Sequence, residues 1–198
     1  MSNHYFDLKQ GSELSFRTLK GTFRGSEVSF FTSSGIFASK AIDEGTRTLI
    51  HFMNIGKQDR VLDLGCGNGL VGLIASTLTH NNVVLTDINE RAVLVSTMNK
   101  KILHCNNVEV VHGDQYRSVH GQLFDIILFN PPQTAGKKLC FSMIEQAPLY
   151  LEQQGSLQLV CRTQKGGKSF GKKMYETFGN VVVIGKAKGY SVYLSRKV

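Results

Sequence analysis

The chain has 198 residues and a net charge of +8, with 41% hydrophobic and 19% charged residues. This composition is typical of one globular domain with a sizeable core and excludes a disordered chain. No stretch reaches the roughly 20 apolar residues of a membrane span, and the first ten residues lack an apolar signal region. We therefore predict a single domain over residues 1–198, located in the cytoplasm, with no membrane partner.

The cysteines and histidines argue against a metal or redox centre. The four cysteines (Cys66, Cys105, Cys140 and Cys161) form no Cys-x-x-Cys pair, and the six histidines show no metal-ligand spacing. We expect the thiols to be reduced and structural, and we expect no bound metal.

Two regular elements are predicted before residue 60. Apolar and polar residues alternate in two short runs, 14–19 and 28–31, with glycines between them. This pattern predicts an N-terminal β-hairpin within residues 1–35, which could serve as a dimer edge, a substrate flap or a lid. A helix over residues 43–53 should follow, with Asp43 as its N-cap and Gly56 beyond its end.

From residue 60 onward, apolar strands alternate with helices. The predicted strands are 61–64, 83–86, 108–111, 124–129, 157–161, 181–184 and 190–194, and the predicted helices are 70–78, 90–103, 137–151 and 168–178. Buried strands separated by helices indicate a parallel sheet that is covered on both faces. The last two strands are joined by residues 185–189, which is too short for a parallel crossover, so the final strand should be antiparallel.

These elements predict an α/β fold. Residues 36–198 should form a Rossmann-like, seven-stranded mixed sheet of six parallel strands and one antiparallel strand, with helices on both faces. The N-terminal β-hairpin precedes this core.

A glycine-rich turn follows the first strand of this sheet and opens a helix. Its sequence is Asp63-Leu64-Gly65-Cys66-Gly67-Asn68-Gly69. Three glycines allow a sharp turn and a close approach between the backbone and a ligand. Asp87, at the end of the next strand, can accept both hydroxyls of a ribose. Asp114, after the third strand, is placed to hold an adenine amino group.

Two cofactors fit this layout. Gly67-x-Gly69-x-x-Gly72 matches the dinucleotide fingerprint, but a lone match of that kind is weak. Asp63 would repel a pyrophosphate, whereas it suits the cationic amino-acid end of S-adenosylmethionine. We therefore predict S-adenosylmethionine, and the alternatives are a nicotinamide cofactor or a turn without a ligand.

A second candidate site, Asn130-Pro131-Pro132, follows the fourth strand. The two prolines make a rigid turn that presents hydrogen-bond acceptors only. Asn130 Oδ1 and the Pro131 carbonyl can accept the two hydrogens of one planar amino group and turn its lone pair toward a methyl sulfonium. Catalysis would then consist of positioning and electrostatic complementarity. The alternative is an ordinary Asn-Pro turn that closes a strand.

The positive charge is concentrated in the last third of the chain. Residues 1–136 hold 12 Lys/Arg and 12 Asp/Glu, whereas residues 137–198 hold 11 Lys/Arg and 3 Glu. A basic face suits a phosphate backbone, although a solvated surface is the alternative. The candidate backbone contacts are Lys137, Lys138, Arg162, Lys165, Lys168, Lys172 and Lys173.

Several motifs occur together and in order. They are Ser34-Gly35-Ile36-Phe37-Ala38-Ser39, Ile42-Asp43-x-Gly45-Thr46, the Asp63–Gly69 turn, Asp87-Ile88-Asn89-x-Arg91-Ala92-Val93, Asn130-Pro131-Pro132 and Gly189-Tyr190. From about His4 to the C-terminus the chain resembles the methyltransferase-small domain of the ribosomal RNA small-subunit methyltransferase C family, a class I S-adenosylmethionine-dependent family. It is most similar to short, single-domain archaeal members.

The resemblance implies a role for each matching residue. The expected donor-binding residues are Asp63, Gly65, Cys66, Gly67, Asn68, Gly69, Asp87, Ile88, Asn89, Asp114, Gln115, Phe37, Thr46 and Asn130. Asn130 and Pro131 should hold the target amine and act as the catalytic pair. For Phe37 the competing interpretation is core packing, and for Asn89 it is capping of the helix that begins at Glu90.

Two features depart from the family pattern. Bacterial members carry an extra N-terminal copy of the fold, which this chain lacks. Gln133 and Thr134 follow the prolines at a place where an aromatic residue is common. Beside Pro132, Gln133 can hydrogen-bond the edge of a base, or Phe37 or Phe141 can supply the stacking ring.

The first functional hypothesis is methylation of an exocyclic amine in RNA, with guanine N2 of ribosomal RNA as the target and RNA or a ribosomal subunit as the partner. The alternatives are methylation of a glutamine amide in a protein, methylation of adenine N6, or RNA binding by a degenerate fold without activity. The oligomeric state, monomer or homodimer, stays open.

Overall fold

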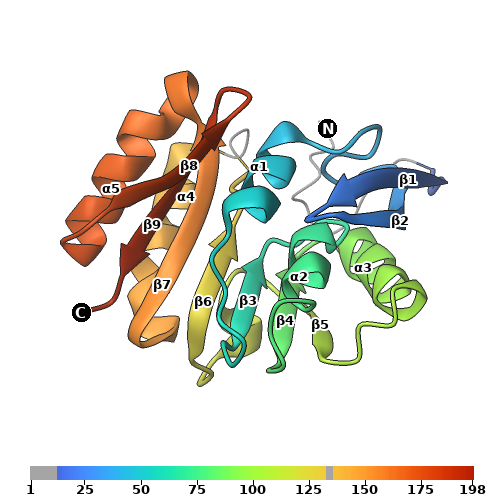
Figure 1. Ribbon diagram of the computed structural model, residues 1–198, viewed down its shortest axis with the longest axis horizontal. Helices are drawn as coiled ribbons and strands as arrows, with labels where there is room; N and C mark the ends of the chain where they lie inside the picture. Colours follow the sequence, from blue (N-terminus) through green and yellow to red (C-terminus); the bar gives the residue numbers. More distant parts are fainter. Residues whose placement is uncertain (1–12, 133–135) are drawn as a thin grey trace.

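The computed structural model describes residues 13–132 and 136–198 of the chain. They form a two-stranded hairpin and a seven-stranded sheet with the strand order β5-β4-β3-β6-β7-β9-β8 (Figure 1). The sheet strands are β3 (Val61–Leu64), β4 (Val83–Asp87), β5 (Val108–His112), β6 (Phe124–Phe129), β7 (Leu151–Arg162), β8 (Val182–Ala187) and β9 (Tyr190–Arg196). The helices are α1 (Glu44–Phe52), α2 (Leu70–Ala75), α3 (Glu90–Ile102), α4 (Lys137–Gln146) and α5 (Lys168–Phe178).

The sheet has the predicted mixture of strand directions. Neighbouring strands from β5 to β7 all pair in parallel, and β9 pairs antiparallel with both β7 and β8. The β8–β9 connection is a tight turn in which Gly189 has a φ of 78°. A turn of this length can join only antiparallel strands. The predicted six parallel strands and one antiparallel strand are therefore confirmed.

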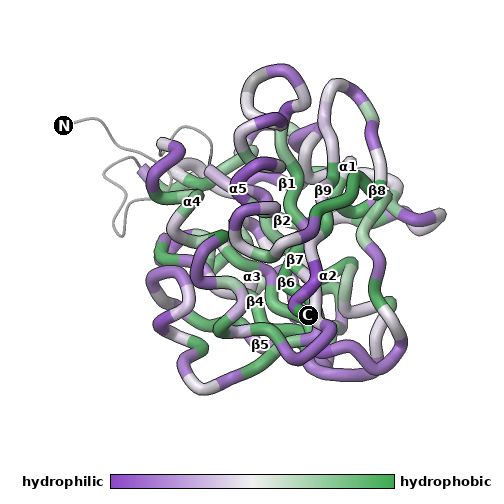
Figure 2. The backbone as a smooth tube through the Cα atoms, turned by 90° about the vertical axis from the view of Figure 1, so that its left-hand side faces the viewer, coloured by the Kyte–Doolittle hydropathy of each residue, from purple (hydrophilic) through white to green (hydrophobic). Residues whose placement is uncertain are grey.

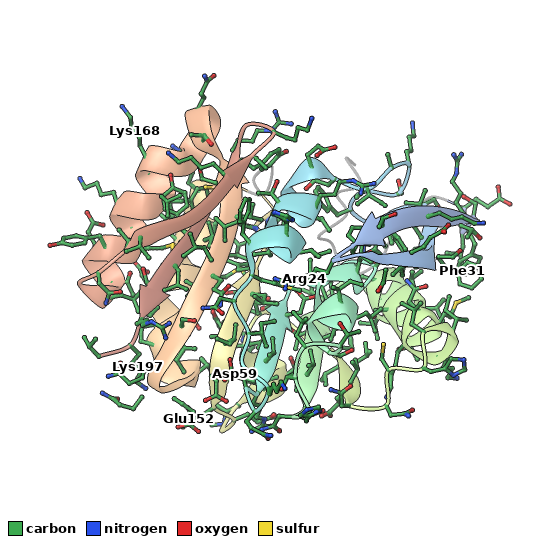
Figure 3. All side chains as sticks on the ribbon, viewed as in Figure 1. Arg24, Phe31, Asp59, Glu152, Lys168 and Lys197 are labelled. Carbon is green, nitrogen blue, oxygen red and sulfur yellow. The ribbon has the colours of Figure 1, made fainter. Side chains whose placement is uncertain are left out.

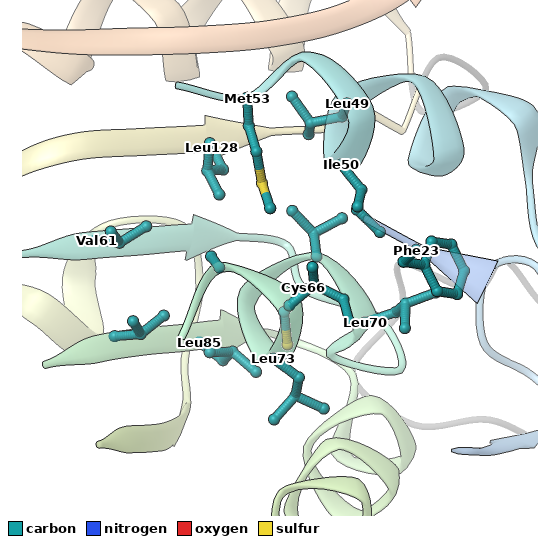
Figure 4. Close-up of a cluster of buried hydrophobic side chains, with 14 of the residues drawn as sticks. Phe23, Leu49, Ile50, Met53, Val61, Cys66, Leu70, Leu73, Leu85 and Leu128 are labelled. Carbon is teal, nitrogen blue, oxygen red and sulfur yellow. The ribbon is translucent and has the colours of Figure 1, made fainter. Parts of the chain in front are cut away.

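Helices cover both faces of the sheet, because alternate strand residues point to opposite sides. Val61 packs in one buried cluster together with residues of α1 and α2, and the next residue, Leu62, packs in a second cluster with residues of α4 and α5. Figure 4 shows the first cluster, where Leu49 of α1 and Leu70 of α2 lie over the strands. In Figure 2 the apolar strands lie inside and polar loops surround them.

The boundary between the fourth helix and the fifth strand differs from the prediction. Helix α4 ends at Gln146, and the next four residues form a 3-10 turn that contains Pro148. Proline has no N–H and clashes with the preceding helical turn, so it ends the helix early. Strand β7 then begins at Leu151, six residues before its predicted start. The prediction missed this first part because Glu152, Gln153 and Gln154 are exposed and carry no apolar signal.

The N-terminal hairpin, β1 (Phe16–Phe23) and β2 (Ser26–Ser33), is docked on the core. Asn99 of α3 accepts from Phe31 N at 2.7 Å and donates to Phe31 O at 2.9 Å. At the hairpin turn, the Arg24 guanidinium donates to the carbonyls of Ile50 and Met53 at the end of α1, at 2.9 and 2.6 Å. Figure 3 labels Arg24 and Phe31 on this hairpin. The hairpin is therefore anchored to two helices.

Two negative findings apply to residues 13–132 and 136–198. None of their helices is both long enough and apolar enough to cross a membrane. They contain no group of three or more His, Cys, Asp or Glu side chains that could hold a metal ion. All four cysteines are free and buried.

Candidate active site

The glycine turn lies between the end of β3 and the start of α2, at the carboxyl edge of the sheet. Gly65 and Gly67 have φ values of 72° and 59°, a region that favours glycine. Apart from the two adjacent residues, no other described residue has an atom within 4 Å of the position that a Cβ would occupy on either glycine. Both residues line the cavities described next, so a side chain there would fill space that a ligand can use.

Two adjoining cavities open above this turn. Their volumes are about 140 and about 30 Å³, and both are lined by Phe37, Gly65, Gly67 and Asn130. The larger cavity is also lined by Ile36, Thr86, Asp87, Ile88, Ala92, Gly113, Asp114, Gln115, Phe129, Pro131, Pro132, Leu139 and Met143. The smaller cavity is also lined by Ala38, Ile42, Asp43, Thr46, Asp63, Cys66, Asn68, Leu70 and Val71.

Asp87 fixes the shape of the turn and faces the larger cavity. One carboxylate oxygen accepts from Gly67 N at 2.8 Å and the other from Asn89 N at 2.9 Å. Burial raises the pKa of Asp87, while these backbone hydrogen bonds act in the opposite direction. A carboxylate has about four lone-pair sites, so Asp87 retains acceptor capacity for hydroxyl groups of a ligand.

Asp63 faces the smaller cavity from β3. Its side chain is 3% exposed, and its Oδ2 accepts from Gly72 N at 2.8 Å. Burial raises the pKa of Asp63 to about 7, and the nearby charge of Asp87 adds to the rise. A buried carboxyl group of this kind is stabilised in its ionised form by a cation, so the smaller cavity suits the charged amino group of a ligand.

Asn130 lies at the junction of the two cavities, and its amide is oriented by α1. Its Nδ2 donates to Thr46 Oγ1 at 3.1 Å and to Asp43 Oδ2 at 3.5 Å. An ionised Asp43 only accepts hydrogen bonds, so the amide nitrogen must face it. Oδ1 of Asn130 is therefore the end of the amide that remains for a ligand.

Asp43 itself is held by its position at the start of α1. It is the N-cap of the helix, and its Oδ2 accepts from Thr46 N at 3.0 Å. Its Oδ1 accepts from the hydroxyl of Tyr190 at 3.4 Å. The orientation of Asn130 therefore depends on residues of α1 and β9, which lie far from it in sequence.

Thr86 contributes a polar atom that the protein leaves unsatisfied. It lines the larger cavity from the end of β4, and its buried hydroxyl has no partner among the described residues. A buried polar group without a partner is costly. Together with the open glycine cradle and the two buried carboxyl groups, it fits a polar ligand such as S-adenosylmethionine.

The structure places most of the predicted donor-binding residues around the cavities. Asn89 and Gly69 are the exceptions, since neither lines a cavity. Asn89 Oδ1 caps α3 at Arg91 N, and its Nδ2 donates to Gly35 O at 2.8 Å, so capping is the role that the geometry supports. A Cβ on Gly69 would lie 2.8 Å from Ser96 Cβ, so Gly69 is needed for packing.

The predicted substrate-binding residues are more scattered. Pro131 and Pro132 line the larger cavity, whereas Lys137 and Lys138 are exposed at the start of α4, next to its mouth. Arg162 is exposed at the end of β7. Lys168 is exposed at the start of α5, at the upper left of Figure 3.

Five further residues that the sequence analysis named have different outcomes. Gln133 and Thr134 lie outside the described residues, as does the side chain of Lys165. The Lys173 amine pairs with Glu145, and Lys172 pairs with Glu176, so these two lysines already have acidic partners.

Sequence reasoning missed several cavity residues. Asp43 was assigned to helix capping alone, because its contact with Asn130 joins residues 87 positions apart. Thr86, Leu139 and Met143 carried no signal, since they look like ordinary strand and helix positions. Only the packing of α4 against the sheet brings the last two to the cavity.

Comparisons with known proteins identify the family of the chain. Residues 27–194 match the family model described as the methyltransferase small domain. The chain is 34% identical to YbxB of Bacillus subtilis (strain 168), and the match covers all of both chains. It is 29% identical to the ribosomal RNA small subunit methyltransferase C of Hamiltonella defensa, over 93% of this chain and 51% of that protein. The chain thus spans about half the length of that methyltransferase.

The end-to-end match with YbxB adds a bacterial protein to the short members that the chain resembles. This Bacillus protein aligns along its whole length with this chain. The short form is therefore found in a bacterium.

A solved structure shares the fold. The 16S rRNA N2 G1207 methyltransferase (RsmC) of T. thermophilus, in complex with AdoMet and guanosine, superposes with a TM-score of 0.82 at 22% identity. The superposition covers 94% of this chain and 52% of that chain. The chain therefore belongs to the methyltransferase small domain family and has the class I fold of S-adenosylmethionine-dependent methyltransferases.

Proposed function

We propose that the protein transfers a methyl group from S-adenosylmethionine to an exocyclic amino group of a nucleobase in RNA, with guanine N2 of ribosomal RNA as the first candidate. The observation that carries the proposal is the fixed amide of Asn130 at the junction of the two cavities. When bound, S-adenosylmethionine supplies an electrophilic methyl group.

Two acidic residues favour one orientation of the donor in the two cavities. Asp63, in the smaller cavity, is placed to pair with the amino group of the donor, and Asp87, in the larger cavity, to accept its ribose hydroxyls. Asp114 and Gln115 line the larger cavity beyond Asp87 and are the candidates for contacts with adenine. In this orientation the reacting methyl would lie between the two carboxylates, next to Asn130.

Only hydrogen-bond acceptors contact the amino group that receives the methyl group. Asn130 Oδ1 and the Pro131 carbonyl take the two hydrogens of a planar amino group, which directs its lone pair out of that plane. Because Asp43 and Thr46 fix the amide before substrate arrives, little reorganisation is needed at the moment of transfer. The positively charged product nitrogen then loses a proton, so no strong base is required before attack.

Two observations favour RNA as the substrate: the distribution of charge along the chain and the names of its relatives. The whole positive excess of the chain lies in its last third, whereas a glutamine-amide site needs no such charge. Proteins named ribosomal RNA small subunit methyltransferase C match most of this chain, and RsmC was solved with guanosine. Both observations favour a base in RNA over a protein amide.

Methyl transfer from radiolabelled donor tests the proposal. The acceptors are ribosomal RNA from a strain that lacks the protein and, in parallel, a release-factor peptide with a glutamine. We expect label in RNA only, in a methylated nucleoside that mass spectrometry identifies. Asn130→Ala should lower the rate at least ~100-fold, because the amine is no longer positioned, while donor affinity changes little. Label in the peptide but not in RNA, or an unimpaired Asn130→Ala variant, would overturn the proposal.

A further inference from the structure

A basic groove lies beside the acceptor site, at the ends of β7 and the β8–β9 turn. Its first part is a hollow of about 580 Å³, lined by Arg162, Thr163, Gln164, Lys186, Lys188 and Tyr190, among others. A second hollow of about 300 Å³ shares Ala187 and Lys188 with the first and continues toward Arg47 and Arg24. We call the two hollows together the basic groove.

The cations of this groove are not neutralised by the protein. Arg162, Lys186 and Lys188 are exposed, and none forms an ion pair with a carboxylate in the described part of the chain. Among the described residues that line the groove, Glu44 is the only acid. Two lysines of α5 differ from these cations, since Lys172 and Lys173 pair with glutamates. The groove therefore concentrates uncompensated positive charge.

The groove is also rigidly connected to the acceptor site. The guanidinium carbon of Arg162 lies 5.3 Å from the centre of the Tyr190 ring, a cation–π contact that holds the arginine in place. Tyr190 is 7% exposed and donates its hydroxyl to Asp43 Oδ1. Asp43 Oδ2 in turn accepts from Asn130 Nδ2. Tyr190 and Asp43 thus lie between Arg162 and Asn130, the residue that would hold the target amine.

We propose that the basic groove binds the phosphodiester backbone of an RNA strand whose target base enters the acceptor site; this inference rests on the proposed function. A guanidinium binds two phosphate oxygens at once, and lysine ammonium groups add point charges along the strand. Contacts of this kind fix the position of a strand without reading its sequence. The base, unstacked from its neighbours, then reaches Asn130.

Of the three cations that carry this inference, the charge pattern singled out Arg162 but neither Lys186 nor Lys188. Lys186 and Lys188 are as basic as the lysines of α5, and only the packing of the β8–β9 turn beside Arg162 gathers them into one hollow. Gln164 and Thr163 add uncharged groups to its wall. An acidic polypeptide is the competing occupant, and the experiment includes it.

RNA binding without donor tests the inference. The probe is a fluorescently labelled single-stranded RNA, and its dissociation constant is measured by anisotropy over a range of salt concentrations. The test variant is Arg162→Ala/Lys186→Ala/Lys188→Ala. The matched control is Lys57→Ala/Lys100→Ala/Lys101→Ala, which removes the same charge near the amino ends of the strands, at the edge of the sheet away from the groove. Circular dichroism and donor affinity report whether each variant is folded.

We expect the groove variant to bind RNA on the order of 10- to 100-fold more weakly than the wild type, and the control to bind nearly normally. The plot of log affinity against log salt should become less steep by about 2, since each lost phosphate contact contributes about 0.7 for single strands. Equal weakening in both variants, or stronger competition by polyglutamate than by unlabelled RNA, would overturn the inference.

The outcomes also separate this inference from the proposed function. If the wild type binds RNA through the groove but transfers no methyl group to any RNA, the function fails and the groove stands. If the wild type methylates RNA and the groove variant does so with unchanged KM, the inference that the groove binds RNA is wrong and the proposed function stands. We expect the groove variant to show a raised KM for RNA and a nearly unchanged kcat.

Discussion

At the scale of single residues, Asp43 links parts of the site that are separate in sequence. It caps α1, accepts from the Asn130 amide and accepts from the Tyr190 hydroxyl. Asp43 touches no reacting atom in the proposed mechanism, so it acts through Asn130 as a positioning residue. Its ionised carboxylate is what forces the amide oxygen of Asn130 toward the ligand.

Asp43→Asn separates this positioning role from the helix cap. Asparagine caps helices about as well as aspartate, so the midpoint of thermal unfolding should change little. An asparagine can turn its own NH₂ toward Asn130 and thereby favour the reversed amide. We expect kcat to fall roughly 10-fold with a nearly unchanged KM for the donor. Equal kcat values for the variant and the wild type would contradict the role.

The Asp63 carboxyl group should make donor affinity depend on pH. Its pKa in the folded protein is about 7, well above that of an exposed carboxyl group, because it is buried. Donor binding favours the ionised form, so affinity should rise as pH increases through about 7, and binding below this pH should release a proton. Calorimetry in buffers with different ionisation enthalpies measures both effects.

The same pKa shift has the opposite effect on stability without the donor. Burial disfavours the charged carboxylate, so the contribution of Asp63 to stability is fully present below about pH 4, the ordinary pKa of the group, and is lost as pH rises from there through about 7. Asp63→Asn cannot ionise and should remove the pH dependence of donor affinity and that of stability.

Donor affinity of the wild type that stays constant between pH 6 and 8, to within about twofold, would contradict the role of the Asp63 carboxyl group in both effects.

At the scale of elements, α3 connects the hairpin to the glycine turn. Asn99, which is fully buried, bonds both backbone groups of Phe31 and also donates to Asn68 O at 2.8 Å. The hairpin leads directly into the segment that contains Ile36 and Phe37, both of which line the larger cavity. The hairpin therefore supports one wall of the site, a role that differs from a free flap.

Asn99→Ala should loosen this connection. The change leaves the Phe31 N–H, the Phe31 carbonyl and the Asn68 carbonyl without their partner, all three in partly buried hydrogen bonds. An unsatisfied group costs about 1–3 kcal/mol when it is fully buried and less where water reaches it. We expect the free energy of unfolding in urea to fall by roughly 2–4 kcal/mol. Thr97→Ala, on the same helix, is the control and should stay within about 0.5 kcal/mol of the wild type. A decrease in the free energy of unfolding of about 0.5 kcal/mol or less for Asn99→Ala would contradict the role of this side chain.

At the scale of the whole molecule, the site joins three parts of the fold: the segment after the hairpin, the sheet and α4. The larger cavity is lined from the hairpin side by Ile36 and Phe37, from the sheet by Asp87 and Asn130, and from α4 by Leu139 and Met143. A ligand in this cavity contacts all three parts. Donor binding should therefore stabilise the whole domain in proportion to its affinity.

Thermal unfolding measures this stabilisation. S-adenosylhomocysteine at about 100 times its dissociation constant should add about 2.7 kcal/mol. For a domain of this size, that corresponds to a rise in Tm of roughly 5–10 °C. Asn130→Ala should keep most of the shift, because its role concerns the acceptor, and Asp87→Ala should lose most of it. An equal shift in wild type and Asp87→Ala would contradict the assigned donor contact.

Local patterns in the chain were sufficient for the architecture and for the main residues of the site. Strands β3 and β6 and helix α5 have their predicted bounds, because apolar periodicity and flanking glycines act within a few residues. The Gly65–Gly69 turn, Asp87 and the Asn130 turn lie together because parallel strands end at one edge of the sheet.

Contacts between distant segments were beyond the reach of such patterns. Three features depend on how the helices and strands pack against one another. They are the pairing of Asp43 with Asn130, the anchoring of the hairpin by Asn99, and the position of Arg162 beside Lys186 and Lys188. A side chain has the same local signal whether or not a partner from another element lies beside it. Packing in three dimensions therefore fixed the orientation of the Asn130 amide and the position of the basic groove.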